Sequence, residues 1–79
     1  MTLKLKIKPV WNGDRNYTAS EFVNDLFKTF DNITDIKYKQ DSVSFWTYKA
    51  KIHFFGVSKT IMKRALIAHD STYGTIIKI

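Results

Sequence analysis

The sequence predicts one small α+β domain, with a four-stranded antiparallel sheet and two helices on one of its faces. The first observation is length, because 79 residues leave room for a single hydrophobic core. The second is composition: 44% hydrophobic and 15% aromatic residues suffice for a packed core and argue against disorder. The third is the order of periodic segments, which is strand, helix, strand, strand, helix, strand.

The first strand is predicted at residues 3–8, where apolar side chains alternate strictly with lysines. This period of two places the apolar side chains on one face of an extended chain and the lysines on the other. Pro9 is expected to bend or weaken the strand. The Asn-Gly-Asp sequence at residues 12–14 predicts a turn or loop.

The first helix is predicted to begin at Thr18, which forms a capping box with Glu21. Tyr17 and Phe22 occupy the positions of a hydrophobic staple. The helix is expected to end at residues 31–32. Its predicted apolar stripe consists of Phe22, Val23, Leu26, Phe27 and Phe30.

A second strand is predicted at residues 33–39, a tight turn at 40–42 and one long third strand at 43–55. The third strand is rich in β-branched and aromatic residues and contains neither glycine nor proline. Its expected inward side chains are Trp46, Tyr48, Ala50, Ile52 and Phe54. An alternative divides this strand near residues 47–51 and gives a five-stranded meander, although no turn residue lies there.

The second helix is predicted to follow Gly56, with Ser58 as its cap. Its expected buried side chains are Ile61, Met62, Ala65, Leu66 and His69. A loop at 71–74 and a last strand at 75–79 complete the order β-α-β-β-α-β, the split-βαβ or ferredoxin-like arrangement. In that arrangement the first and third strands are central, and here they are predicted to be the long ones, whereas the two edge strands are short.

The lysine side chains are predicted to gather on the sheet face that the helices leave open. The chain has 13 lysines and arginines against seven acidic residues, a formal charge of +6 and a pI near 9.7. Such a balance favours a polyanionic partner. The residues expected on this face are Lys4, Lys6, Lys8, Lys37, Lys39, Phe45, Lys49, Lys51 and His53, with Lys78 as a further candidate.

Three functions are compatible with this face. The leading hypothesis is a small, non-enzymatic nucleic-acid-binding protein that contacts phosphates of DNA or RNA with low sequence specificity. Eleven lysines against two arginines favour charge over bidentate base contacts, and Phe45 or His53 could stack on a base. The second is a protein-interaction module, such as a phage-encoded or mobile-element-encoded inhibitor or accessory subunit, that docks on an acidic protein. The third is a solvated surface that keeps the sheet soluble.

The residue types that enzymes use are sparse. His53 and His69 are the two histidines, there is no cysteine, and no acidic pair has the spacing of a metal site. We therefore expect neither enzymatic activity nor a cofactor or metal. A metal-independent nuclease based on His53 and neighbouring lysines is a minor alternative.

The remaining expectations concern location and assembly. The alternation of lysine and apolar residues at the N-terminus is unlike a signal peptide, and no stretch is long and apolar enough to span a membrane, so a cytoplasmic protein without a membrane partner is expected. An exposed edge strand, residues 33–39 or 75–79, could pair with a second copy to form a homodimer. Topology and open face are similar to those of single-stranded RNA-binding domains, but VSFWTYKAKIHFF does not contain their aromatic signature, so no family is assigned.

Overall fold

The computed structural model describes residues 1–12, 15–43, 47–70 and 75–79, and for residues 10–12 and 15–17 it describes the backbone. Strands and helices follow one another along these ranges, with a pair of short strands before the first helix. The elements are β1 (Thr2–Ile7), β2 (Val10–Asn12), β3 (Arg15–Tyr17), α1 (Ala19–Thr29), β4 (Ile33–Gln40), β5 (Tyr48–Phe54), α2 (Lys59–Asp70) and β6 (Ile76–Lys78).

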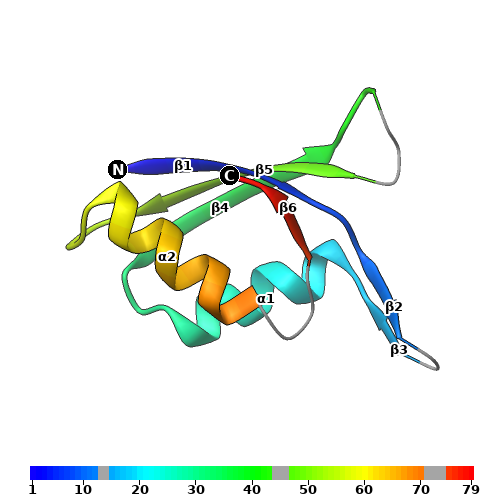
Figure 1. Ribbon diagram of the computed structural model, residues 1–79, viewed down its shortest axis with the longest axis horizontal. Coiled ribbons are helices and arrows are strands. Elements are labelled where there is room, and N and C mark those ends of the chain that lie inside the picture. Colours follow the sequence, from blue (N-terminus) through cyan, green and yellow to red (C-terminus); the bar gives the residue numbers. More distant parts are fainter. Residues whose placement is uncertain (13–14, 44–46, 71–74) are drawn as a thin grey trace.

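The main sheet has four antiparallel strands in the order β4-β5-β1-β6. β1 and β4 both run antiparallel to β5, so they are parallel to each other with β5 between them. Figure 1 shows α1 and α2 together on one side of this sheet, while its other side carries no helix. The predicted α+β domain with a four-stranded antiparallel sheet and two helices is confirmed.

The β2-β3 hairpin was not predicted, and it interrupts the expected order between the first strand and the first helix. Val10 pairs with Tyr17 and Asn12 with Arg15 in a separate two-stranded sheet. Three-residue strands are too short to show a period of two, so the pattern on which the prediction relied is absent there. The predicted turn falls partly at residues 13–14, which lie outside the described residues.

The alternation predicted for the central strands is confirmed. In β1 the apolar residues are buried and the lysines face the other way, and in β5 the same pattern holds, with Ala50 and Ile52 buried and Lys49 and Lys51 exposed. β5 is continuous from Tyr48, so a break within it is excluded, but it starts later than the predicted Val43. Trp46 lies outside the described residues.

The core comprises Leu3, Leu5, Ile7, Ala19, Phe22, Val23, Leu26, Ile33, Ile36, Ala50, Ile52, Phe54, Met62 and Leu66.

The predicted lengths of the edge strands need correction. β4 has eight residues and is longer than β1 or β5, although it lies at the edge of the sheet. Lysines on its open face and a register irregularity between Ile33 and Asp35 are features that protect a long edge from pairing with other chains. β6, with three residues, is short as expected.

Both helices begin at the predicted caps. The Thr18 hydroxyl accepts a hydrogen bond from the Glu21 N–H at 3.2 Å, and the Ser58 hydroxyl accepts one from the Ile61 N–H at 3.2 Å. These bonds satisfy amide groups that have no partner within the first helical turn. α1 ends at Thr29, two residues before the predicted terminator at residues 31–32, with Phe30 as its C-cap. The predicted staple involves Tyr17, whose side chain lies outside the described part of the chain.

Two residues assigned to the buried helix faces are exposed. Phe27 of α1 is 42% exposed and Ile61 of α2 is 55% exposed. At about 100° per residue, Phe27 lies about 90° and Ile61 about 140° from the centre of the buried residues on its helix. Phe22, Leu26, Met62 and Leu66 lie near those centres and are almost fully buried.

The end of α2 is joined to β6 by a buried carboxylate that the sequence analysis did not identify. The two side-chain oxygens of Asp70 accept hydrogen bonds from the N–H groups of Thr75 and Ile76, at 2.9 and 2.7 Å. Asp70 is only 7% exposed, so these charge-assisted bonds compensate for its desolvation. They set the position at which β6 joins the sheet.

Burial on α2 leads to a stability prediction. Leu66→Ala removes a side chain with no exposed surface and should cost roughly 2–5 kcal/mol of unfolding free energy, enough to unfold a domain of this size in part. Ile67→Ala is the matched control, because Ile67 is 51% exposed and should cost less than about 1 kcal/mol. Urea denaturation followed by circular dichroism measures both. Equal losses would contradict the assigned orientation of α2.

Candidate functional site

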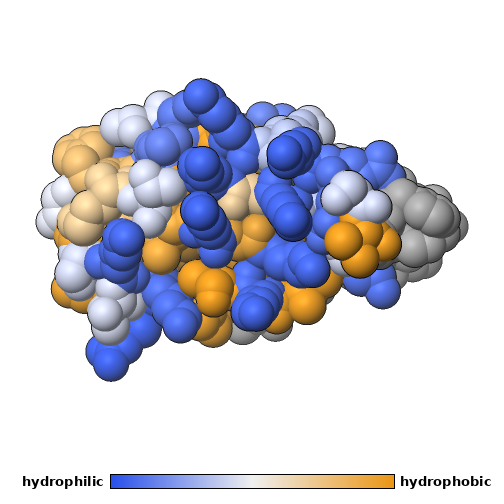
Figure 2. Space-filling model, turned by 90° about the horizontal axis from the view of Figure 1, so that it is seen from above, coloured by the Kyte–Doolittle hydropathy of each residue, from blue (hydrophilic) through white to orange (hydrophobic). Residues whose placement is uncertain are grey.

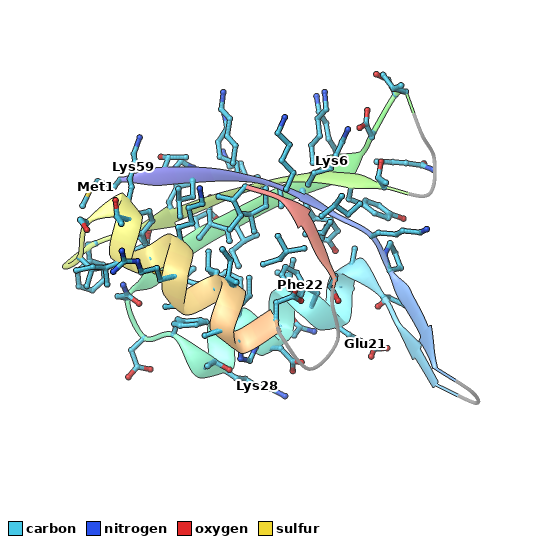
Figure 3. All side chains as sticks on the ribbon, viewed as in Figure 1. Met1, Lys6, Glu21, Phe22, Lys28 and Lys59 are labelled. Carbon is cyan, nitrogen blue, oxygen red and sulfur yellow. The ribbon has the colours of Figure 1, made fainter. Side chains whose placement is uncertain are left out.

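Lysine side chains project from the sheet face that the helices leave open. Figure 3 shows a group of nitrogen-tipped side chains, with Lys6 labelled beside them, on the side of the sheet opposite α1 and α2. In β1 and β5, successive residues point to opposite faces of the sheet, so the lysines face outward while the residues between them enter the core. Alternation in β1 and β5, together with the pairing of β4 against β5, therefore brings scattered lysines onto one surface, although Tyr38 of β4, expected to face inward, is 40% exposed.

The strand register arranges these lysines in two rows that cross the sheet. Neighbouring members of a row are direct partners on adjacent strands. The first row consists of Lys37 on β4, Lys51 on β5 and Lys4 on β1. The second row consists of Lys39 on β4, Lys49 on β5, Lys6 on β1 and Lys78 on β6. These seven residues are called the lysine rows below.

The rows surround a shallow hollow of about 710 Å³ whose lining includes all seven of these lysines. Figure 2, which views the open face, shows hydrophilic side chains standing over smaller apolar areas. The side chains of Lys49 and Lys6 are 57% and 41% exposed, so their ammonium groups remain accessible to an anion. The flexible lysine stems allow these groups to converge on a ligand.

This arrangement concentrates positive charge. Adjacent strands are about 4.8 Å apart, and like charges placed directly opposite each other destabilise a sheet. Two unit charges 4 Å apart repel by about 1 kcal/mol even in water. A bound polyanion would replace these repulsions with attractions, so the rows are suited to a ligand with several negative charges.

Asp41 provides a countercharge at one corner of the rows. One carboxylate oxygen lies 3.3 Å from the Lys6 Nζ, and the other lies 4.0 Å from the Lys49 Nζ. The Val43 N–H donates to the carboxylate at 3.0 Å, and the Thr47 hydroxyl donates at 3.5 Å. Asp41 thus connects the segment that follows β4 to the second row.

The charge state of Asp41 follows from these contacts. The hydrogen bond from the Val43 N–H lowers the pKa of Asp41 below its ordinary value. Burial of the carboxyl opposes this change, while Lys6 and Lys49 lower the pKa further. Asp41 is therefore a carboxylate at neutral pH, and it holds two ammonium groups in place.

The other predicted site residues lie outside the rows. Lys8 is exposed, but it does not line the hollow, and its N–H donates to the Thr75 carbonyl at 2.9 Å. His53 is half-buried, with its Nδ1 3.0 Å from the Thr2 hydroxyl, and it does not line the hollow either. Phe45 lies outside the described residues. Six predicted lysines therefore come together, joined by Lys78.

Asp41 is the member of this site that the sequence analysis missed. A tight turn was predicted at 40–42, whereas β4 includes Gln40 and β5 begins at Tyr48, so the connection is longer than predicted. An aspartate whose side chain binds a backbone N–H two residues later is a common feature of such connections. Its contacts with Lys6 and Lys49 come from residues distant along the chain or across a turn. Only the strand pairing brings these lysines beside the carboxylate.

Neither a metal centre nor a membrane span was found in the part of the chain that the structure describes. No three histidine, cysteine or acidic side chains there could hold a metal ion together. None of the helices in the same part has the length and apolar character needed to cross a membrane. Comparisons of the chain with models of protein families, with curated proteins and with solved structures gave no match.

The contacts of Asp41 predict a pH-dependent contribution to stability. Its pKa is lowered by folding, so the carboxylate stabilises the fold above its unfolded pKa of about 3.9, and this contribution is lost as the pH falls further. Asp41→Asn should lower the urea midpoint at pH 7, and the difference from the unaltered protein should shrink below about pH 4. Asp35→Asn, an equal charge change at an exposed position of β4, is the control. A constant difference from pH 7 to pH 3 would contradict the stabilising role of the charge.

Proposed function

We propose that this chain is a non-enzymatic nucleic-acid-binding protein that holds the phosphate backbone of DNA or RNA on the lysine rows. One observation carries the proposal: seven lysines from four strands lie around one hollow on the sheet face that bears no helix. Phosphates that bind such a surface release condensed counterions, which supplies much of the affinity of nucleic-acid-binding proteins.

Low sequence specificity follows from the chemistry of the rows. Each row member is a lysine, whose ammonium is a mobile point charge that attracts phosphates of any sequence. Bidentate recognition of base edges is made chiefly by arginine, asparagine and glutamine, whose planar groups hold two hydrogen-bonding atoms at a fixed spacing. Base identity should therefore alter affinity less than salt concentration does.

The fold supports the same proposal at the level of architecture. We regard the domain as a ferredoxin-like variant into which the β2-β3 hairpin is inserted, and we place its activity in the cytoplasm. The strand order β4-β5-β1-β6, with both helices on one side, supports the ferredoxin-like assignment. This arrangement leaves one whole sheet face available to a ligand.

Charge reversal on the rows tests the proposal. Lys4 and Lys51 are direct partners in the first row, and neither contacts Asp41, so they can be changed without disturbing that corner. The double variant Lys4→Glu/Lys51→Glu should weaken binding to labelled oligonucleotides by about tenfold or more at low salt and should flatten the dependence of log Kd on log salt. Fluorescence anisotropy across a salt series measures both quantities.

The matched control is Lys28→Glu/Lys63→Glu, which changes the net charge equally. Lys28 lies on α1 and is seen in Figure 3 on the side of the molecule away from the rows, and Lys63 is an exposed residue of α2. Circular dichroism confirms that both variants fold. Equal weakening by the two would show that net charge alone acts, and normal binding by the row variant would overturn the proposal. Weak binding by the unaltered protein would favour an acidic protein partner instead.

A further inference from the structure

We infer that the ligand is a single strand and that its phosphate backbone crosses the β-strands between the two lysine rows. This inference rests on the proposed function and adds the direction and class of the ligand. A path along the strands is the opposing possibility, because β1 carries Lys4 and Lys6, and Lys8 follows directly after its end. The two paths use different lysines, so the geometry of the charged area distinguishes them.

The shape of the charged area favours the path across the strands. The second row spans all four strands, a length of about 14 Å, whereas the two rows are separated by only about 7 Å along the strands. At each of the strands β4, β5 and β1, one lysine stands on either side of the line between the rows. A backbone on this line meets a pair of ammonium groups at every strand that it crosses.

Beyond the rows, the positive charge does not continue along β4 or β5, and along β1 it continues at Lys8, after the end of that strand. On one side, the next positions across the sheet are Thr2, His53 and Asp35, which pair with one another. On the other side lies Asp41, whose carboxylate is already engaged with Lys6 and Lys49. A phosphate chain that followed β4 would therefore meet an acidic residue at each end of Lys37 and Lys39.

The segment after β4 also obstructs a path along the strands. In Figure 1 the chain at residues 41–43 rises from the end of β4 above the open face. Asp41 holds its base, since its N–H donates to the Thr47 carbonyl at 2.9 Å and its carboxylate binds Lys6. Residues 41–43 therefore stand beyond the second row at the end of β4 and obstruct a path along that strand.

The width of the charged area favours a single strand. A separation of about 7 Å between rows accommodates one backbone. A duplex presents two backbones on either side of a groove about 6 or 12 Å wide. Across the wider groove, the second backbone would lie beyond the rows, over the Asp35 position or beside Asp41, where it meets no lysine of the rows. Across the narrower groove, each backbone would lie over one row and meet one lysine per strand, whereas a single backbone between the rows meets two.

Two alanine variants distinguish the paths. Lys78 ends the second row on β6, whereas Lys8 continues β1 beyond it, and both are exposed. With a single-stranded oligothymidylate as the probe, Lys78→Ala should weaken binding severalfold and reduce the salt slope by about 0.7, the value for one phosphate contact on a single strand. Lys8→Ala should leave both quantities within error of the unaltered protein. A duplex of the same length should bind more weakly than the single strand.

Each contrary result has a separate meaning. Loss of affinity with Lys8→Ala and none with Lys78→Ala would overturn the path across the strands, as would equal losses. Tighter binding to the duplex would overturn the single-strand assignment. In these cases the lysine rows remain the binding surface, provided that the Lys4→Glu/Lys51→Glu variant has lost affinity. Failure of the unaltered protein to bind any oligonucleotide at low salt would remove the proposed function itself, and the path with it.

Discussion

The pairing register of β1 with β5 is the constraint on which the rest of this structure depends. Leu5 lies opposite Ala50 and Lys6 lies opposite Lys49, so the same ladder of hydrogen bonds defines the core and the lysine rows. A shift of one residue would exchange the two faces of a strand and bury lysine ammonium groups without partners. The apolar core therefore enforces the crowding of positive charge on the other side, because neither pattern can change without the other.

That crowding is tolerated because it lies next to water and because Asp41 relieves one corner. The carboxylate is almost fully buried, yet its contacts with the Val43 N–H and with two ammonium groups keep it charged. It connects the segment that follows β4 to the strands that carry the second row. Electrostatics and loop geometry thus reinforce each other at this corner, and the remaining lysines stay available to a ligand.

The sequence predicted the parts of the fold that depend on local periodicity and on caps. Strict alternation in residues 3–8 gave the orientation of β1, and the capping residues Thr18 and Ser58 gave the starts of both helices. The β2-β3 hairpin was missed because its strands are too short for a periodic signal. Phe27 and Ile61 were misplaced because each lies at the border of an apolar stripe, where only the packed structure decides which side chains are covered. Strand alternation assigned the lysines to one face. Their division into two rows and the role of Asp41 depend on the cross-strand register, which alternation alone does not fix.

The attachment of β6 has a consequence for the motions of this surface. This strand has three residues, and its register against β1 is irregular. The carboxylate of Asp70 at the end of α2 binds the N–H groups of Thr75, which precedes the strand, and of Ile76, its first residue. Short edge strands with few ladder bonds exchange their amide hydrogens through local opening long before the whole domain unfolds. The second row begins on the long strand β4 and ends on β6, the strand of this sheet that should open most easily. Local opening of β6 would therefore move Lys78 away from the other six lysines. How often this happens depends on Asp70 of α2, on the opposite side of the sheet, because its carboxylate binds the start of β6.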